Sequence, residues 1–384
     1  MNILVTGGAG FIGSHTCDML ANAGHTVRIL DCLDPQIHGP HGAFPAGLAP
    51  GIERMRGDVC SMDDCLAAVE GIDAVLHLAS RTGVGQSMTD VADYVETNVR
   101  GTATLIEAVT KSRARLRRFV LASSRAVYGE GLFECARHGR MHPDVRDRAR
   151  LLAGRFDMPC PVCDRAMQPV PTPESCDSKP LSAYAWTKRH QEDLCQWAVS
   201  TFDIPTVILR YFNVYGSGQS LQNPYTGVVS IFYSRLKAGR SLSLYERGLP
   251  LRDFVHVQDV ARANLLALEG KDAAGGCFNI GSGQPRTIAD IAQALGRQIG
   301  METVPFEDRG EFRVGDVFAC VADLERAAAQ LGYRPTVDLD EGMREFAAWA
   351  AGQDATDGYD KTVAELSQYG LFGAAGPKKA NQAA

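Results

Sequence analysis

The chain begins Met1-Asn-Ile-Leu-Val-Thr-Gly-Gly-Ala-Gly-Phe-Ile-Gly13, and this stretch decides the fold. The apolar run Ile3–Val5 is typical of a strand that is buried on both faces of a parallel sheet. Gly7, Gly10 and Gly13 then recur at every third position. Glycines in that order permit a tight turn, a close approach of backbone N–H groups to a pyrophosphate, and close packing of the next helix on the strand.

The residues after the glycines predict a dinucleotide site. A helix is expected over residues 11–23, with the first N–H groups, including those of Phe11 and Ile12, pointing at the phosphates. About 20 residues after the glycines, the stretch 25–31 reads as a second strand that ends in Asp31. A carboxylate there hydrogen-bonds an adenosine ribose diol and repels a 2′-phosphate, so the sequence predicts NAD rather than NADP.

Strands and helices continue to alternate through residue 124, which predicts a doubly wound parallel sheet of the Rossmann type. Strands are expected at 72–79 and 118–124, and a helix at 90–113 with Val95 and Val99 on its apolar side. The cofactor is expected to meet residues beyond the strand ends and one residue within that helix: Asp58, Val59, Leu78, Ala79 and Asn98.

The composition excludes several classes of partner. The chain has 384 residues and a net charge of −6, which argues against nucleic acid and anionic membranes as partners. No run of apolar residues is long enough to span a bilayer, and the amino terminus lacks the basic region of a signal peptide. We therefore expect a cytoplasmic protein, in which most of the 11 cysteines are buried thiols.

Five regions are expected along the chain. They are the Rossmann region 1–130, an inserted Cys/His segment 131–176, a Rossmann continuation 177–215, a smaller and mainly substrate-binding lobe 216–350, and a carboxy-terminal helix with a disordered tail 351–384, the tail starting at Gly373. Helices are predicted at 181–201, 228–238, 258–268, 287–299, 322–331 and 338–350, and strands at 206–210, 253–257 and 277–280.

The predicted helix after the insert carries Tyr184 and Lys188. At a spacing of four residues they share one helix face, and the ammonium is expected to lower the pKa of the phenol so that it works as an acid and base. Ser124, at a strand tip, can hydrogen-bond the same substrate oxygen. The pair occurs by chance in many helices, but with the glycine triplet, Asp31 and Ser124 in the right order it predicts a catalytic group.

Together these motifs resemble the extended branch of the short-chain dehydrogenase/reductase superfamily, the NAD-dependent nucleotide-sugar epimerases and dehydratases. The similarity extends to about residue 350 and rests on Thr6–Gly13, Ser123–Gly129, the Tyr184/Lys188 pair, Arg210–Gly216, Arg252–Val257 and Arg313–Asp316. The resemblance implies that Asn213, Arg252 and Arg313 hold a nucleotide diphosphate, which guanidinium groups bind bidentately. It also implies a homodimer that pairs the helices at 90–113 and 181–201.

One position bears on the reaction. Dehydratases of this family carry acidic residues after the serine, whereas this chain has Arg125-Ala126, and Arg125 either contacts substrate or faces solvent. We therefore expect a 4-epimerase that oxidises the sugar at C4 and reduces it on the other face. The insert makes the chain most similar to dTDP-L-rhamnose 4-epimerases. The alternatives are a 4-ketoreductase, a UDP-hexose 4-epimerase, and a non-catalytic regulator, which Tyr184 and Lys188 disfavour.

The insert contains Cys135-Ala-Arg-His138 and Cys160-Pro-Val-Cys163. Two such knuckles supply the three thiolates and one imidazole of a closed, structural zinc site. The segment has little apolar content, so a metal would stabilise its fold. The alternative is a surface loop with free thiols, and Cys176 could replace one ligand. Its place between Ser124 and Tyr184 predicts a flap near the sugar.

Overall fold

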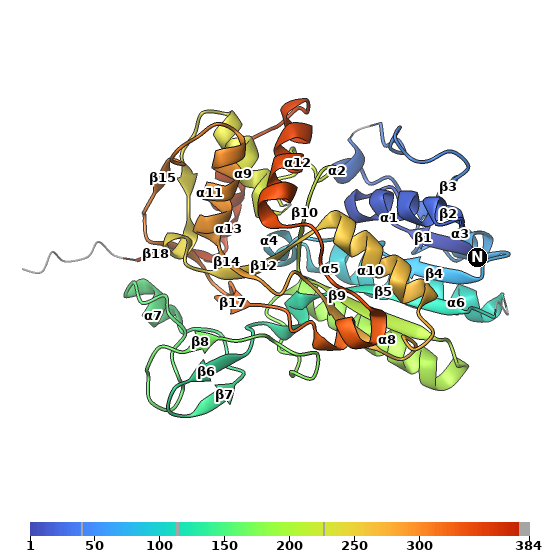
Figure 1. Ribbon diagram of the computed structural model, residues 1–384, viewed down its shortest axis with the longest axis horizontal. Helices are drawn as coiled ribbons and strands as arrows, with labels where there is room; N and C mark the ends of the chain where they lie inside the picture. Colours follow the sequence, from blue (N-terminus) through green and yellow to red (C-terminus); the bar gives the residue numbers. More distant parts are fainter. Residues whose placement is uncertain (40, 113–114, 226, 376–384) are drawn as a thin grey trace, which may run out of the picture.

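The central sheet has seven strands, all parallel, and the amino-terminal strand lies in its interior (Figure 1). The computed structural model describes residues 1–39, 41–112, 115–225 and 227–375. The strands, in spatial order, are β13 (Cys277–Ile280), β9 (Thr206–Tyr211), β5 (Arg118–Ser124), β4 (Ala74–His77), β1 (Asn2–Thr6), β2 (Thr26–Asp31) and β3 (Glu53–Arg56). This order confirms the predicted doubly wound sheet. The order reverses next to β1, which is where such sheets bind ligands.

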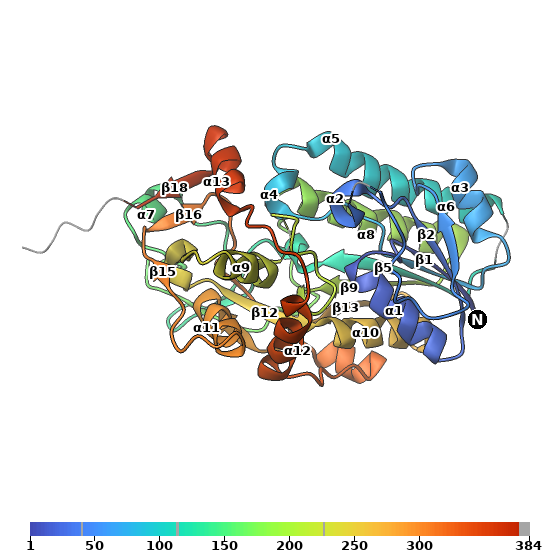
Figure 2. The same ribbon diagram turned by 90° about the horizontal axis from the view of Figure 1, so that it is seen from above.

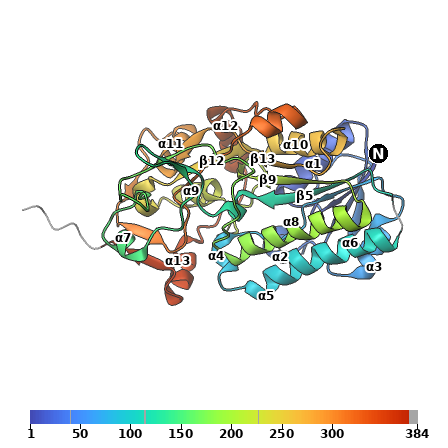
Figure 3. The same cartoon turned by 90° about the horizontal axis from the view of Figure 1, so that it is seen from below.

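Helices cover both faces of the sheet. Helices α1 (Phe11–Asn22) and α10 (Val257–Glu269) pack together on one face (Figure 1). Helices α3 (Met62–Val69), α6 (Gly101–Lys111) and α8 (Ala183–Phe202) lie side by side on the other face (Figure 3). Because both faces are covered, the strands carry continuous apolar runs, as in the fully buried Ile3–Val5 of β1.

The helix predicted at 90–113 is a continuous helical run with a change of pitch. It comprises α5 (Val91–Tyr94), a π-helical turn at Val95–Arg100 and then α6; residue 113 lies outside the described residues. The prediction that Val95 faces the core is wrong, since 46% of this side chain is exposed. The buried positions in this part of the helix are Tyr94 and Asn98 instead.

A smaller lobe lies beyond the carboxyl ends of the strands (Figure 2). Its sheet joins β10 (Asn213–Tyr215), β12 (Leu251–His256) and β14 (Pro285–Thr287), with β17 (Ala319–Cys320) beside β12. Two strand pairs, β11 (Leu242–Ser243) with β15 (Phe306–Glu307) and β16 (Glu311–Arg313) with β18 (Phe372–Ala374), accompany it. Its helices are α9 (Val228–Lys237), α11 (Ile288–Gln298), α12 (Leu339–Ala351) and α13 (Tyr359–Gln368), while short helices α2 (Pro35–His38) and α4 (Val84–Ser87) belong to the Rossmann region.

The insert forms its own small body beside this lobe (Figure 1). Strands β6 (Phe133–Cys135), β7 (Gly139–Met141) and β8 (Gln168–Pro169) make a three-stranded antiparallel sheet, and α7 (Arg148–Leu152) lies alongside it in Figure 1. The expectation of little apolar content needs correction, because Phe133, Met158 and Met167 are buried in one cluster. Part of the folding energy of the insert therefore comes from packing.

The helix expected at 322–331 is confirmed from residue 325 on, where two α-helical residues lead into a π-helical turn at Ala327–Leu331. Residues 321–323 are extended, because Thr172, at the end of the insert, bonds to the backbone of Val321 and Asp323. One further prediction is wrong. The tail expected from Gly373 begins as strand β18, which pairs with β16. The rest of that predicted tail, residues 376–384, lies outside the described residues.

The other predicted helices and strands are confirmed to within a few residues at their ends. Among the described residues, none of the helices combines the length and the apolar character that a membrane crossing requires.

Candidate active site

The glycine turn forms a cradle that only glycine permits. A Cβ atom on Gly13 would lie 2.2 Å from the backbone oxygen of Gly7, so helix α1 can pack on β1 at this distance only without a side chain. Helix α1 begins at Phe11 with no side chain capping its N–H groups and no acidic residue in its first turn. Its first donors are therefore available to an anion, which fits the diphosphate of NAD.

Asp31 lies beside this cradle, at the tip of β2. Its carboxylate accepts hydrogen bonds from the backbone N–H of Ala9, at 3.0 Å, and of Leu33, at 2.9 Å. The carboxylate thus fixes the glycine turn against β2. Its position at the strand tip also fits the ribose contact predicted from the sequence.

Four of the remaining predicted cofactor residues follow the ends of two strands, β4 and β3. Ala79, which follows Leu78 beyond the end of β4, donates its N–H to Thr6 and lies against Gly7, so this strand tip lines the cradle. Asp58, with Val59 beside it, accepts the N–H of Cys60 at 2.8 Å.

Asn98 is fully buried and is directed at protein rather than at the cradle. Its carboxamide bonds to the backbone N–H and oxygen of Arg81 and to the hydroxyl of Thr187 in α8. These partners make it a support that joins the loop after β4 to the helix of Tyr184.

Ser124, Tyr184 and Lys188 meet where β5 ends and α8 begins. The side chain of Ser124 acts on the phenol of Tyr184 and favours its ionised form, and the ammonium of Lys188 lies 6.0 Å from the centre of the Tyr184 ring. The same ammonium donates to the backbone oxygen of Ala122 at 2.8 Å. Two hydroxyls and one amine therefore converge on the carboxyl end of the sheet, beside the glycine cradle.

The expected effect of Lys188 on Tyr184 is wrong for the protein alone. Burial raises the pKa of Tyr184, and the opposing effects come from Ser124 and Arg125, not from Lys188. Burial also lowers the pKa of Lys188 to about 7, because it disfavours the ammonium form. A positive charge beside the phenol, as in the oxidised nicotinamide of bound NAD, would favour the phenolate.

Arg252 and Arg313, which come from different strands, meet at one carboxylate that the sequence analysis did not single out. Asp316 accepts from Arg252 at 3.0 Å and from Arg313 at 3.1 Å. Burial alone would raise the pKa of Asp316, but the two guanidinium groups outweigh it and hold this pKa well below its usual range. The signal for Asp316 was its place at the end of the Arg313–Asp316 motif.

Two more predicted substrate residues border this arginine pair. Arg125 follows Ser124 directly and acts electrostatically on Tyr184, Arg252 and Asp316. The side-chain oxygen of Asn213 is buried and has no hydrogen-bond partner among the described residues. An unpartnered buried amide is costly, so it fits a residue that bonds to a ligand.

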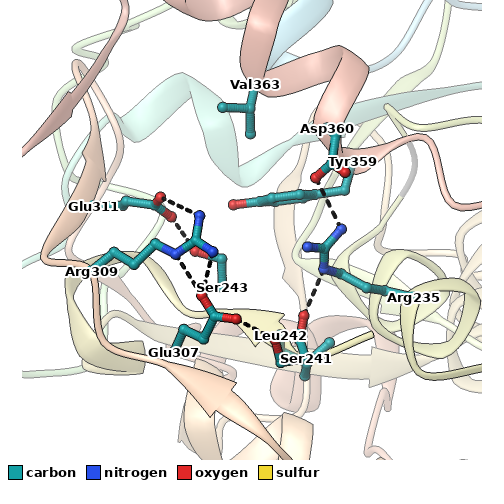
Figure 4. Close-up of a pocket in the computed structure, with 10 residues that line it drawn as sticks. All are labelled: Arg235, Ser241, Leu242, Ser243, Glu307, Arg309, Glu311, Tyr359, Asp360 and Val363. Atoms are coloured by element: carbon teal, nitrogen blue, oxygen red, sulfur yellow. Dashed lines mark hydrogen bonds and ion pairs between the residues drawn. The ribbon is translucent and has the colours of Figure 1, made fainter. Parts of the chain in front are cut away.

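A separate cavity of about 110 Å³ lies in the substrate lobe, between β11, β15 and α13 (Figure 4). Charged groups that line it are paired: Arg309 bonds to Glu307, and Arg235 bonds to Asp360. None of Ser124, Tyr184 and Lys188 lines this cavity. This cavity is therefore distinct from the cluster of Ser124, Tyr184 and Lys188.

The four predicted metal ligands converge in the insert. The ligand atoms of Cys135, His138, Cys160 and Cys163 all lie within 4.8 Å of one another. The backbone N–H of Arg137 contributes most to a pKa of about 6 for the Cys135 thiol. Cys176, the alternative ligand, packs instead against the cluster around Val127 and Tyr128.

Comparison with known proteins places this geometry in context. The model of the NAD dependent epimerase/dehydratase family matches residues 3–148 and 160–281. A dTDP-L-rhamnose 4-epimerase from Burkholderia thailandensis is 37% identical over 91% of this chain and 94% of its own length. A UDP-glucose 4-epimerase from Halalkalibacterium halodurans is 28% identical over 94% of this chain and 98% of its own length. The break in the family match, at 149–159, falls inside the insert.

Solved structures agree on the fold. The UDP-glucose 4-epimerase of Thermotoga maritima, with UDP-glucose, has a TM-score of 0.74 and 28% identity, and the alignment covers 91% of this chain and 99% of that one. The UDP-glucose 4-epimerase of Thermus thermophilus, in complex with NAD, has a TM-score of 0.72 and 28% identity over 92% of this chain and 100% of that one.

Lys188 predicts a pH-dependent stability. Its pKa is 10.5 for an ordinary lysine and about 7 in the fold, so above pH 7 the unfolded chain binds a proton that the folded protein lacks. The contribution of Lys188 to the free energy of unfolding should therefore rise with pH, by up to about 1.4 kcal/mol per pH unit. Urea unfolding between about pH 7 and about pH 9 should show a shallower pH dependence for Lys188→Met than for wild type. The exposed Lys111→Met serves as control, and parallel curves for Lys188→Met and wild type would contradict the assignment.

Proposed function

Because this chain belongs to the NAD dependent epimerase/dehydratase family, we propose that it is an NAD-dependent nucleotide-sugar 4-epimerase. The observation that carries the proposal is the meeting of Ser124, Tyr184 and Lys188 at the end of β5, beside a glycine cradle that fits a dinucleotide. Arg252 and Arg313, joined at Asp316, supply the positive charge that a sugar diphosphate needs.

In this mechanism Tyr184 removes the proton from the sugar 4-hydroxyl, and Ser124 holds the same oxygen through a hydrogen bond. Lys188 anchors α8 to β5 through its bond to Ala122, and the positive charge of oxidised NAD, when bound, would favour the charged phenol. NAD, when bound, supplies the hydride acceptor and donor at C4. The arginine pair would hold the diphosphate while the 4-keto sugar turns about that link, so that hydride returns to the opposite face of C4 and Tyr184 gives its proton back to the C4 oxygen.

The proposed conversion is dTDP-L-rhamnose to dTDP-6-deoxy-L-talose. It is supported by the 37% identity with the Burkholderia enzyme, against 28% for the UDP-glucose 4-epimerase from Halalkalibacterium. Arg125, in place of an acidic residue after Ser124, argues against dehydration. A UDP-hexose 4-epimerase is the second candidate, favoured by the structural neighbours. A 4-ketoreductase that consumes NADH is the third.

We further propose that Cys135, His138, Cys160 and Cys163 bind a structural zinc ion. Tetrahedral zinc, with bonds of about 2.3 Å to sulfur and about 2.0 Å to nitrogen, requires sulfur–sulfur separations of about 3.8 Å and sulfur–nitrogen separations of about 3.5 Å. The separations here are 3.8 Å for Cys135–Cys163 and 3.6 and 3.4 Å for His138 with Cys135 and Cys160. All four ligand positions would be filled by protein, so the metal would take no part in catalysis.

A homodimer and a cytoplasmic location complete the proposal. Large apolar side chains on the helical run from α5 to α6 and on α8 are exposed, with Val95 at 46%, Trp186 at 52% and Trp197 at 50%. These helices lie side by side (Figure 3), so two copies can pair them as a four-helix bundle. Thiolate ligands require a reducing compartment, which supports the cytoplasm.

The first test is incubation of the purified protein with dTDP-L-rhamnose and with UDP-glucose, in separate tubes and without added reductant. The C4 proton of the sugar is followed by NMR. We expect the signal of dTDP-L-rhamnose to be replaced by that of dTDP-6-deoxy-L-talose, with no net change in NADH. Tyr184→Phe should lose about 10²- to 10⁴-fold in turnover while it keeps its fold and its bound NAD. Conversion of UDP-glucose alone would favour the second candidate, and NADH-dependent loss of a 4-keto sugar the third. A Tyr184→Phe enzyme with most of its turnover would refute the role of the phenol.

The metal is tested by elemental analysis of the protein purified without added zinc. We expect about one zinc per chain. Cys160→Ser should lose the metal and expose the insert to protease, because metal binding contributes to its folding. Cys176→Ser should keep the metal. Equal zinc content in Cys160→Ser and wild type would rule out the proposed ligand set.

The dimer is tested by light scattering after gel filtration. Trp197→Glu should shift the protein from dimer to monomer, because it introduces a charge into an apolar interface. Tyr369→Glu is the matched control, since Tyr369 is 64% exposed but lies after α13. A wild-type monomer, or a Trp197→Glu dimer of unchanged stability, would contradict this interface.

A further inference from the structure

We propose that Arg146 of the insert is a positioning residue that braces the diphosphate-binding arginines, so that the insert works as a strut for the substrate lobe. This inference rests on the proposed function, since it assigns a role to residues around the Arg252–Arg313 pair. It gives the inserted segment a part in substrate binding that neither the glycine cradle nor the catalytic tyrosine explains.

The contacts of Arg146 link three segments. Its side chain is fully buried, with 0% exposed, as is its partner Glu246 of the substrate lobe. The guanidinium pairs with both carboxylate oxygens of Glu246, one of them at 3.0 Å. It also donates to the backbone oxygen of Asp316 at 3.2 Å and to that of Phe156, within the insert, at 2.7 Å.

Asp316 is the residue on which Arg252 and Arg313 converge, so Arg146 holds the backbone of the residue that aligns them. The stretch that follows is fixed by Glu130, at the entry to the insert. The Glu130 carboxylate accepts from the N–H of Phe318, at 2.8 Å, and of Ala319, at 3.2 Å. Both ends of the stretch 316–319 are therefore tied to the insert or its border.

The insert also makes an apolar contact with β16, the strand that carries Arg313. Leu151 of α7 and Phe156 form a buried cluster with Phe312, the residue before Arg313 in β16. The insert thus touches the strand of Arg313 by packing, in addition to its polar contact at Asp316. The insert therefore contacts both Asp316, on which the two arginines converge, and Phe312, the neighbour of Arg313.

The backbone at the far end of the Arg146–Glu246 pair is strained. Glu246 and Arg247 have φ values of 51° and 61°, which side chains other than glycine rarely adopt. Such a conformation persists only where the surroundings impose it, and the paired Arg146 supplies that constraint. The guanidinium carbon of Arg313 lies 5.7 Å from the centre of the ring of Tyr245, which is next to this turn. The turn is therefore connected directly to one of the two arginines that are proposed to bind the diphosphate.

Buried acidic and basic side chains surround Arg146, next to the arginines that are proposed to bind the diphosphate. The buried carboxylates Glu130, Glu246 and Asp316 face the guanidinium groups of Arg146, Arg252 and Arg313, and Arg125 adds a further positive charge. Burial raises the pKa of Glu130 to about 7, against the opposing charge of Arg146. Removal of Arg146 would leave carboxylates that compete with the diphosphate for Arg252 and Arg313.

The test compares Arg146→Met and Arg146→Lys with Arg155→Met, whose arginine is exposed on the same insert. Binding of dTDP and of UDP is measured by calorimetry, and KM and kcat with the sugar that wild type converts. For Arg146→Met we expect Kd and KM to rise about tenfold or more and kcat to change less than about threefold, with bound NAD and zinc unchanged. Arg146→Lys, which keeps the charge but not the fork, should show a smaller rise in both. Arg155→Met should match wild type.

Two results would overturn the strut. One is wild-type Kd and KM in a folded Arg146→Met; if that variant does not fold, the same result in Arg146→Lys overturns it. The other is a loss of kcat with unchanged Kd. A wild type that binds neither dTDP nor UDP would overturn the diphosphate site, and the strut with it, whereas normal binding without any epimerisation would overturn the proposed activity alone.

Discussion

The bond from the Lys188 ammonium to the backbone oxygen of Ala122 is the contact on which the catalytic geometry depends. It joins helix α8 to strand β5 from inside the protein, at a cost, because burial lowers the pKa of that amine to about 7. The same contact fixes Tyr184, one helical turn earlier, beside Ser124 at the strand tip. Burial of this amine is unfavourable, but the amine aligns helix α8 with strand β5, which come from distant parts of the chain.

Much of the fold could be predicted from the sequence because its signals are local. The glycine triplet has steric consequences that hold wherever it occurs, as the 2.2 Å approach at Gly13 illustrates. Features that depend on tertiary contacts could not be predicted. The stretch after Cys320 has helical periodicity, but Thr172 holds its first residues extended and the helix begins only at residue 325. The exposure of Val95 is likewise set by how the helix packs in the fold.

The candidate site divides in the same way. Tyr184, Lys188 and Ser124 follow from spacing and from strand tips, and the cysteine quartet follows from two short knuckles. Arg146 carries no such local signal, since its role exists only once it lies against Asp316 in space. Asp316 belongs to a sequence motif, but its pairing with Arg252 follows only from the fold. The effect of Lys188 on Tyr184 could not be predicted either, because proximity in a helix says nothing of the burial that dominates both pKa values.

The position of β13 has a consequence for synthesis of the chain. This edge strand, Cys277–Ile280, pairs with β9, whose last residue is Tyr211, so the whole first part of the substrate lobe is translated between them. Until then β9 presents an open edge built of residues that the finished fold buries, and helix α1 gains its partner α10 only shortly before β13 is made. Contacts of such long sequence separation form slowly, and the nascent six-stranded sheet is the species most exposed to aggregation. Chaperone demand should therefore be set by this late edge, rather than by the Cys/His insert.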